Sequence, residues 1–456
     1  MDTKKLRQKI LDLAIRGKLV PQDPNDEPAS VLLERIKAEK ERLIKEGKIK
    51  RTKKTAKTSD TPHYENVPFE VPSSWVWCKL EDIVSFGGGK TPSMDNKEYW
   101  RDGNHPWVTS KDMKCSHITN SLMKITDKAL EVMTIYERGT LLVVTRSGIL
   151  KHTLPISILQ TPATINQDLK AVSPHIQELS EYLYFVIKAN ENFILKEYHK
   201  DGTTVDNIDF DKFKYLPIPL APITEQRRII AETKHWFALI DQIEQGRLDL
   251  QEAIKHAKNK ILDLAIHGKL VPQDPNDEPA SELLKRINPK AEITCDNGHY
   301  QNLPTGWALC RLENIVDYEQ PTDYIVNSTN YDNNYPIPVL TAGKSFIIGY
   351  TNDIEGIYSK LPCIIFDDFT TDSKFVDFPF KVKSSAMKLL QVKHMEVEYV
   401  AMFMSITRLI GDTHKRYWIS EYSKLLIPIP PYAEQKRIVA AVHKVFTQID
   451  TIMESL

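Results

Sequence analysis

Residues 9–36 read KILDLAIRGKLVPQDPNDEPASVLLERI, and residues 260–287 read KILDLAIHGKLVPQDPNDEPASELLKRI. Only three of the 28 positions differ, and the run from 17 to 30 is identical to the run from 268 to 281. Packing alone would preserve the apolar positions of such a segment, whereas this identity extends along a polar, proline-rich turn. The repeat therefore predicts a chain built from two related halves.

Two further pairs of segments recur in the same order in each half. The first pair, 63–84 and 299–316, begins with His-Tyr and carries a tryptophan followed three residues later by a cysteine. The second pair, 218–229 and 427–438, leads from a proline-rich run into Glu-Gln-Arg/Lys-Arg-Ile. The three repeated pairs predict a constant frame that is present twice.

Steps of four and three residues lead from 229 through 233, 236, 240, 243, 247, 250, 254, 257 and 261 to 264. Nine of these eleven positions are apolar. A stripe of that period predicts one long helix from Glu225 to His267, on the order of 65 Å long, that buries a seam against a partner helix. The same phase continues through 438–456 and resumes at 6–13. We therefore expect a second rod, antiparallel to the first, in which the C-terminal helix is followed end to end by the N-terminal helix. Such an arrangement gives the repeat a circular character.

Two inserts, 85–217 and 317–426, lie between the repeated segments and share little sequence. Both inserts mix short β-rich runs with helical runs. The strands expected are 141–145, 156–159 and 363–366, and the helices are 178–192 and 397–410. The predicted fold class is α+β, with two mixed α/β domains separated by a pair of long antiparallel helices and related by a pseudo-two-fold internal repeat.

The repeats divide the chain into five expected segments. These are an N-terminal helix, turn and basic linker (1–62), a first mixed domain (63–220), a central helical region (221–298), a second mixed domain (299–430) and a C-terminal helix (431–456).

The composition is that of a soluble globular protein, with 41% hydrophobic and 27% charged residues. Apolar runs stay below the roughly 20 residues that span a bilayer. Residues 1–8 lack the apolar core of a secretory signal, so a cytoplasmic protein with no membrane partner is expected. Five cysteines without a Cys-x-x-Cys pair argue against a thiolate zinc site or a disulfide framework, and the repeat-equivalent Cys78 and Cys310 are expected in the core.

The formal net charge of −1 hides a basic stretch, because residues 40–57 carry nine Lys or Arg against two Glu. Such a run is typical of a flexible linker. Two alternatives remain for it: a solvated tether, or a tether that also contacts phosphate.

The sequence carries no convincing catalytic, metal or cofactor motif. Gly89-Lys90-Thr91 is like the end of a phosphate-binding loop, but Val84 stands where the first glycine of that loop would fall. The 13 histidines include no His-Glu-x-x-His pair. A chain with no catalytic residue, no metal site and no cofactor of its own is expected.

The doubled segment 9–36, the doubled run into Glu-Gln-Arg/Lys-Arg-Ile and the two unlike inserts resemble the DNA-sequence specificity subunits of type I restriction-modification systems. Residues 87–112, with Thr91-Pro92 and Tyr99-Trp100, also resemble the opening of a target recognition domain. The resemblance implies that each insert reads one half of a bipartite site in double-stranded DNA. It also implies that the helices set the half-site spacing and dock two methyltransferase subunits, which restriction and translocase subunits then join. S-adenosylmethionine, ATP and Mg²⁺ would be bound by those partner subunits.

Base reading needs polar side chains, mainly in the major groove. The candidates are polar residues in turn-rich segments of the inserts, and the duplicated turn supplies acidic candidates for docking a partner. The DNA-binding candidates are Lys90, Thr91, Ser93, Arg101, Ser110, Lys111, Arg146, Ser147, Lys151, Thr204, Lys344, Ser345, Thr370, Thr371, Thr413, Lys415 and Arg416. The docking candidates are Asp23, Asp26, Asp274 and Asp277.

The alternative is a pseudo-symmetric adaptor that binds proteins only. It would keep the helices and repeats but leave unexplained why both inserts are large, different and rich in Arg, Lys, Asn and Thr in their turns.

Overall fold

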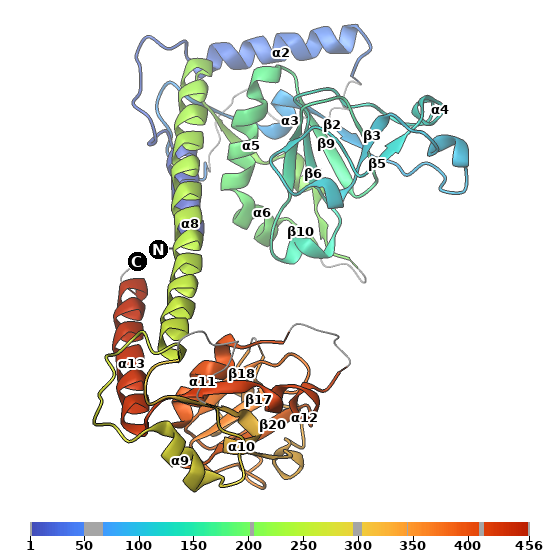
Figure 1. Ribbon diagram of the computed structural model, residues 1–456. Coiled ribbons are helices and arrows are strands. Elements are labelled where there is room, and N and C mark those ends of the chain that lie inside the picture. The colour runs from blue at the N-terminus through green and yellow to red at the C-terminus, as the bar shows by residue number, and fades with distance from the viewer. Residues whose placement is uncertain are drawn as a thin grey trace. The chain divides into compact units, whose positions relative to one another are not determined.

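The computed structural model describes residues 2–49, 67–200, 205–294, 303–343, 345–409 and 415–454 (Figure 1). Its contacts divide the chain into two compact units, 1–246 and 247–456, and each unit mixes helices with strands. In the described part of the chain, no helix is long and apolar enough to cross a membrane.

The first unit begins with two helices that flank the duplicated turn. α1 (Thr3–Ile15) starts at Asp2, whose carboxylate accepts a 3.0 Å hydrogen bond from the backbone N–H of Lys5, a typical N-cap. Arg7 on α1 forms ion pairs of 2.5 Å with Asp241 and 3.1 Å with Glu244 on the long helix α8 (Ile223–Ile266). The turn after α1 returns to Glu225 at the start of α8. Within this unit α1 and the first half of α8 therefore run antiparallel.

Strands close the first insert at its base. β1 (Val76–Lys79) leads into the insert and pairs antiparallel with β12 (Pro217–Leu220), which leads out of it. Inside lie a five-stranded sheet of order β2-β9-β6-β7-β4 and a three-stranded sheet of order β5-β3-β8. The elements are β2 (Val84–Gly88), β3 (His105–Val108), β4 (His117–Ile118), β5 (Met123–Ile125), β6 (Leu141–Val144), β7 (Ile156–Leu159), β8 (Thr164–Ile165), β9 (Leu169–Pro174), β10 (His199–Lys200), β11 (Asn207–Ile208), α2 (Ala29–Lys45), α3 (Leu80–Ile83), α4 (Asp127–Leu130), α5 (Ser180–Ala189), α6 (Glu191–Glu197), α7 (Phe210–Lys214), and the 3-10 turns η1 (Lys97–Tyr99), η2 (Ser110–Asp112), η3 (Gly148–Lys151) and η4 (Gln177–Leu179).

The second unit repeats this plan with fewer strands. β13 (Ala308–Arg311) and β21 (Leu426–Ile429) pair antiparallel at the base of the insert. The sheets have the orders β14-β20-β17-β18 and β16-β15-β19. The elements are α9 (Ala280–Ile287), α10 (Leu312–Ile315), β14 (Val316–Glu319), η5 (Thr322–Tyr324), β15 (Ile337–Leu340), β16 (Ile347–Thr351), β17 (Cys363–Asp367), β18 (Ser373–Val376), β19 (Lys381–Val382), β20 (Met387–Val392), α11 (Val397–Ile406), α12 (Tyr417–Ser420), η6 (Tyr422–Lys424) and α13 (Tyr432–Glu454).

The strands predicted from continuous apolar runs are confirmed as β6, β7 and β17, whose apolar residues are buried. Burial on both faces explains the absence of polar alternation, since every residue of β6 and β7 and four of the five residues of β17 are buried. α5 lies between the five-stranded sheet and α8 in the first unit (Figure 1), where Phe185 packs edge-on against Phe237 of α8 at 6.1 Å. Cys78 and Cys310 are buried, as expected, and burial raises the pKa of the Cys310 thiol to about 12.

Three helix predictions differ from the structure in their details. The helix expected at 178–192 divides into a 3-10 turn, α5 and α6, with a break at Asn190, whose amide bonds back to the carbonyl of Val186. The helix expected at 397–410 ends at Ile406. The long helix is confirmed as α8, but its stripe is buried only in part: Ile240 is 1% exposed, whereas Trp236 and Ile243 are 42% and 48% exposed.

We predict that Gly17→Ala or Gly268→Ala lowers the free energy of unfolding by about 1–3 kcal/mol, because each glycine has φ +65°. A Cβ at these positions would also lie 2.5 Å from Pro72 Cγ and 2.3 Å from Pro304 Cγ, respectively. Gly246 in α8 is the control, since a Cβ there meets no atom within 4 Å. Gly246→Ala should raise stability by roughly 0.5–1 kcal/mol. If thermal unfolding finds Gly17→Ala or Gly268→Ala as stable as Gly246→Ala, the role assigned to the two turn glycines is wrong.

Candidate nucleic-acid interface

The sheet of the first insert gathers several polar turns at one edge. β2 and β6 are both antiparallel to β9, so they run parallel to each other and end at the same edge. The parallel pair β3 and β8 ends beside them, because the backbone N–H of Lys90 donates to the carbonyl of Ile165 at 3.0 Å. We call the turns 88–91, 109–111, 145–147 and 166–168 the polar edge of the first unit.

Hydrogen bonds of the backbone and of side chains hold these four turns together. The N–H of Thr145 donates to Asp168 O at 2.9 Å, and the N–H of Asn166 donates to Val108 O at 3.0 Å. The Thr91 hydroxyl donates to the side-chain oxygen of Gln167. The four turns are far apart in the sequence, but the strands that they follow and these hydrogen bonds hold them side by side as one surface.

The structure brings six predicted DNA-binding residues to this polar edge. Four are exposed and two are half-buried: Lys90, Thr91, Lys111 and Arg146, then Ser110 and Ser147. Lys151 lies one turn further on, at the end of η3, with its Nζ 4.0 Å from the carboxylate of Asp206. The remaining two described candidates of this insert, Ser93 and Arg101, lie in the segment 93–101.

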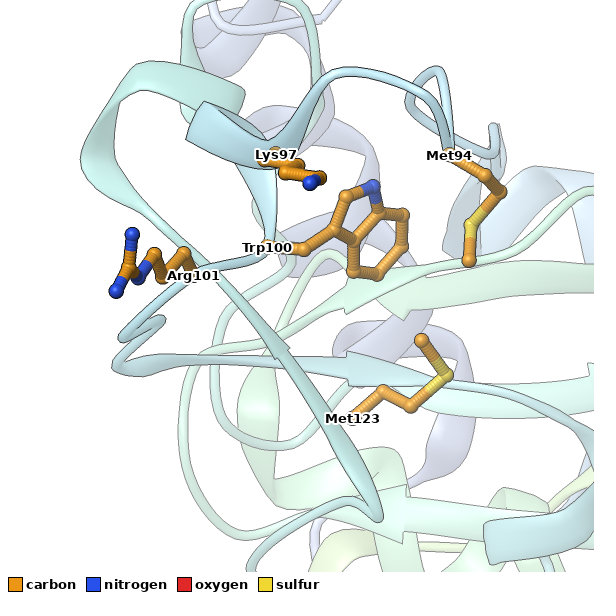
Figure 2. Close-up of a pocket in the computed structure, with 5 residues that line it drawn as sticks. All are labelled: Met94, Lys97, Trp100, Arg101 and Met123. Atoms are coloured by element: carbon orange, nitrogen blue, oxygen red, sulfur yellow. The ribbon is translucent and has the colours of Figure 1, made fainter.

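This segment and Met123 form a shallow pocket of about 480 Å³, lined by Met94, Lys97, Trp100, Arg101 and Met123 (Figure 2). Figure 2 shows both methionine side chains turned toward the Trp100 ring, while Arg101 points away from it. The Trp100 ring nitrogen donates to Ser93 O at 3.0 Å, and the ring packs edge-on against Trp107 at 5.0 Å.

Trp107 connects the pocket to the polar edge, because its ring packs against Trp100 and its ring nitrogen donates to Lys90 O at 3.1 Å. An aromatic face and thioethers beside two cations can contact a base or sugar together with a phosphate. Sequence reasoning missed Met94, Lys97 and Met123, because single apolar or basic residues in a polar stretch carry no signal of a shared pocket.

The second unit builds an equivalent edge with different residues. β14 and β17 are both antiparallel to β20, which is the arrangement of β2, β6 and β9. The turn after β17 carries the exposed Thr370. Asp368 joins this turn to residues 415–418, since its side chain accepts a 2.7 Å hydrogen bond from the backbone N–H of Trp418. The cations of 415–418 thereby lie close to the turn, and Arg416 is 5.9 Å from the centre of the Phe369 ring.

The other candidates of the second insert have separate outcomes. Lys415 is exposed and forms an ion pair with Glu421, and Ser345 is exposed. Thr371 is fully buried at φ +57°, and its hydroxyl accepts from the backbone N–H of Leu409 at 3.2 Å. Its prediction as a DNA-contacting residue is corrected, because the hydroxyl closes a turn inside the domain. Thr204, Lys344 and Thr413 lie outside the described residues.

The four docking candidates fall into two pairs. Asp23 and Asp274 are exposed, and each carboxylate accepts a 2.9 Å hydrogen bond from the backbone two residues later. The side chains of Asp26 and Asp277 are only 7% and 10% exposed, and both form ion pairs with arginines of their own unit. Asp26 and Asp277 thus face the interior, and only the first pair presents a carboxylate to solvent.

Metal binding has no candidate in the described part of the chain, where no three His, Cys, Asp or Glu side chains are grouped suitably. The chemistry of both edges is that of hydrogen bonding, charge and aromatic contact.

The chain thus has two mixed α/β units, each closed by a pair of strands at its base and each with a different polar edge. The chain belongs to the family described as type I restriction modification DNA specificity domain, whose model matches residues 72–251 and 304–456. The resemblance noted in the sequence is thereby confirmed.

Individual relatives support this membership. The specificity subunit of the type I restriction enzyme EcoAI from Escherichia coli is 32% identical over 387 residues, which cover 69% of this chain and 62% of that subunit. The EcoR124I/EcoR124II specificity subunit from the same species is 52% identical over 126 residues, or 26% of this chain and 31% of that subunit. The chain thus spans about 62% of the length of its EcoAI relative.

A solved chain from a study of complex assembly and conformational transition of the type I R-M system shares the fold. It superposes with a TM-score of 0.53 at 14% identity, covering 85% of this chain and 94% of that one.

We predict that Lys111→Ala with Arg146→Ala weakens DNA binding and reduces the salt dependence of binding by roughly one unit of slope for each phosphate that is no longer neutralised. Titrations of the assembled complex on a target duplex at several salt concentrations measure both quantities. Arg35→Ala with Lys37→Ala on α2 is the control, because it removes the same two charges from exposed side chains in the same unit. Equal losses for the control would show that the polar edge has no special part in binding.

Proposed function

We propose that this chain is the sequence-specific DNA-binding subunit of a type I restriction-modification complex. The domain 63–220 would read one half of a bipartite site in double-stranded DNA, and the domain 299–430 the other half. The observation that carries this proposal is the pairing of one strand arrangement with two unlike polar edges. Equivalent scaffolds with different surface residues suit two readers of two different half-sites.

Base-specific reading requires side chains that donate and accept hydrogen bonds at base edges. Lysine, arginine, threonine and serine at the first edge, and Thr370 with Arg416 at the second, supply those groups. Cations beside them can neutralise phosphates, which gives most of the affinity but little sequence discrimination. The edges therefore combine the two components that specific binding needs.

The helices are proposed to set the distance between the half-sites and to dock two methyltransferase subunits, which restriction subunits join. The segments concerned are 1–62, 221–298 and 431–456, with the C-terminal and N-terminal helices forming a second rod antiparallel to α8. In each unit a shorter helix runs antiparallel to its part of α8, and Lys258 of α8 forms a 2.6 Å ion pair with Asp450 of α13. These contacts support the proposed paired rods.

Methyl transfer is assigned to the partners in this proposal. Adenines must leave the base stack to reach a methyltransferase, so the specificity chain would hold the DNA while its partners bind S-adenosylmethionine, ATP and Mg²⁺. The proposed place of action is the cytoplasm, where the target DNA lies.

Exchange of residues 85–217 for the corresponding insert of another such subunit tests the assignment of one insert to one half-site. The new complex should methylate a motif with one changed half and one unchanged half. Sequencing of modified bases in cells that express the complex reports the motif. A motif in which both halves change would contradict the assignment, and a parent complex that binds no DNA would favour the protein-only adaptor.

A second test concerns the rods. Insertion of four residues beside Gly246 lengthens α8 by about 6 Å, so the spacer between half-sites should change or binding should be abolished. The same four residues inserted in the turn at 120, in an exposed loop, serve as the control. An unchanged spacer with full affinity would mean that α8 does not set the spacing.

A further inference from the structure

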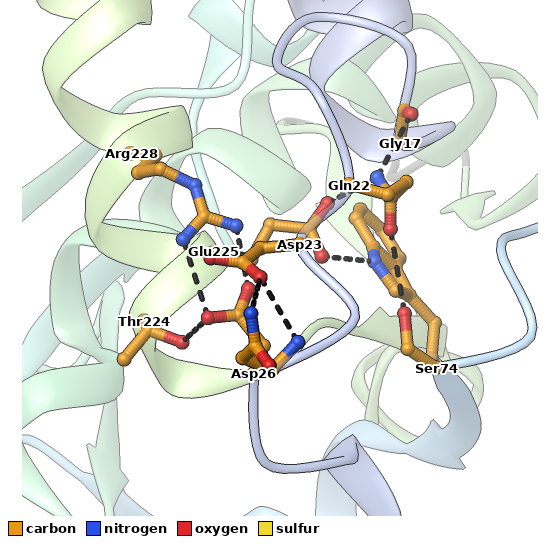
Figure 3. Close-up of polar contacts among 10 residues, drawn as sticks. Gly17, Gln22, Asp23, Asp26, Ser74, Thr224, Glu225 and Arg228 are labelled. Atoms are coloured by element: carbon orange, nitrogen blue, oxygen red, sulfur yellow. Dashed lines mark hydrogen bonds and ion pairs between the residues drawn. The ribbon is translucent and has the colours of Figure 1, made fainter.

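A buried carboxylate joins three distant segments of the first unit (Figure 3). Glu225 lies in the first turn of α8 and is 1% exposed. It accepts a 2.9 Å hydrogen bond from the ring nitrogen of Trp75, next to strand β1, and a 2.6 Å hydrogen bond from the amide of Gln22 in the duplicated turn. Burial raises the pKa of Glu225.

An ion pair fastens the same turn to the same helix. Arg228 lies one turn along α8 and contacts the carboxylate of Asp26 at 2.5 Å and 3.3 Å. The Thr224 hydroxyl also donates to this carboxylate (Figure 3). Arg228 holds the pKa of Asp26 below its usual range. Asp26 therefore stays ionised, and its charge is directed at the helix.

We call the contacts of Glu225 with Trp75 and Gln22, together with the Asp26–Arg228 ion pair, the joint of the first unit. The second unit contains the same joint. The ring nitrogen of Trp307 donates to Glu434 at 3.0 Å, and the amide of Gln273 donates to the other oxygen of that carboxylate at 3.1 Å. Arg437 contacts Asp277 at 2.6 Å and 3.4 Å. Two units with unlike inserts thus share one set of donors, acceptors and distances.

A tyrosine connects each joint to its insert. Tyr182 of α5 donates its hydroxyl hydrogen to Pro219 O on β12, and its ring meets Trp75 edge-on at 6.5 Å. Tyr399 of α11 donates to Pro428 O at 2.6 Å and meets Trp307 at 6.5 Å. The sequence signal for this pair is Glu-Tyr at 181–182 and at 398–399, a short repeat inside inserts that otherwise diverge.

A buried carboxylate is costly unless its oxygens are hydrogen-bonded. Here the donors come from the turn and from Trp75, the residue before the strand that leads into the insert, so the carboxylate is satisfied in one geometry of the three segments. The ion pair adds a directional contact between the turn and the helix. The joint thus restricts the orientation of the insert relative to the helix within its own unit.

We propose that these duplicated joints are orientation clamps, and that Asp26 with Arg228 and Asp277 with Arg437 are positioning residues for DNA reading. This inference rests on the proposed function, and it adds that each clamp acts on the half-site read by its own unit. The near-identity of 17–30 and 268–281 follows from the clamp, because each turn must fit the same Trp, Glu and Arg. The inward direction of Asp26 and Asp277 assigns them to the clamp and leaves docking to exposed groups.

The test compares Arg228→Gln with Arg437→Gln in the full chain, expressed with its methyltransferase partner in cells whose modified bases are then sequenced. Arg228→Gln should reduce discrimination at the bases of one half-site about tenfold, since a charged partner is removed from a nearly buried carboxylate. Discrimination at the other half-site should stay within about twofold, and Arg437→Gln should give the mirrored result.

Control variants separate positioning from general destabilisation. Arg35→Gln and Arg286→Gln remove equivalent arginines from exposed pairs with Glu27 and Glu278 beside the same turns, and both should retain the full motif. Arg228→Lys keeps the charge but replaces the two-nitrogen contact with Asp26 by a single ammonium, so it should recover part of the discrimination that Arg228→Gln loses. A merely structural role would change the amount of complex without favouring one half-site.

The outcomes have distinct meanings. A parent complex that methylates no bipartite motif overturns the proposed function together with this inference. A parent complex with a bipartite motif, whose Arg228→Gln variant keeps both halves or loses both halves equally, overturns the clamp alone. Failure of Arg228→Lys to recover discrimination would also count against it.

Discussion

The structure of both units depends on a carboxylate buried at the start of a helix. Glu225 and Glu434 each receive hydrogen bonds from a tryptophan ring and a glutamine amide, and without these donors the buried charge would be strongly unfavourable. Because the donors belong to different segments, the requirement couples the turn, the base of the insert and the helix. The strand pairs β1-β12 and β13-β21 then start from a defined position.

This constraint explains how a fixed frame can carry unlike inserts. The strands that lead into and out of each insert pair with each other, so the insert is closed at its base whatever its sequence. Beyond the base, both inserts keep an edge strand, a central antiparallel strand and a parallel partner, and vary the turns at their ends. Turns tolerate variation because they lie at the surface, whereas the strands beneath them are buried. In the proposed function, the buried strands place each edge, and the turns contact the DNA and select its sequence.

Sequence reasoning predicts the repeated segments, the long helix and the central strands, because each has a local signal in its identity, period or apolar run. It does not predict that Trp75 meets Glu225, since 150 residues separate them and neither has a partner nearby in sequence. Asp26 lies in a polar turn, so its side chain is expected to be exposed. The ion pair with Arg228 instead holds the Asp26 carboxylate in a buried position. The prediction for Thr371 is wrong for a related reason: a polar residue in a polar turn is buried here by the backbone of residue 409. The pocket lined by Trp100 likewise arises only when distant turns meet.

Hydrogen–deuterium exchange of the assembled complex tests the central claim most directly, that two separate edges contact DNA. The complex would be compared free, with a duplex carrying both half-sites, and with duplexes in which one half-site is replaced. The account predicts protection at 88–91, 109–111, 145–147 and 166–168 together with 367–371 and 415–418 on the complete site, and loss of protection in one unit only when one half-site is replaced. Protection confined to the helices, or protection that disappears from both units together, would contradict it.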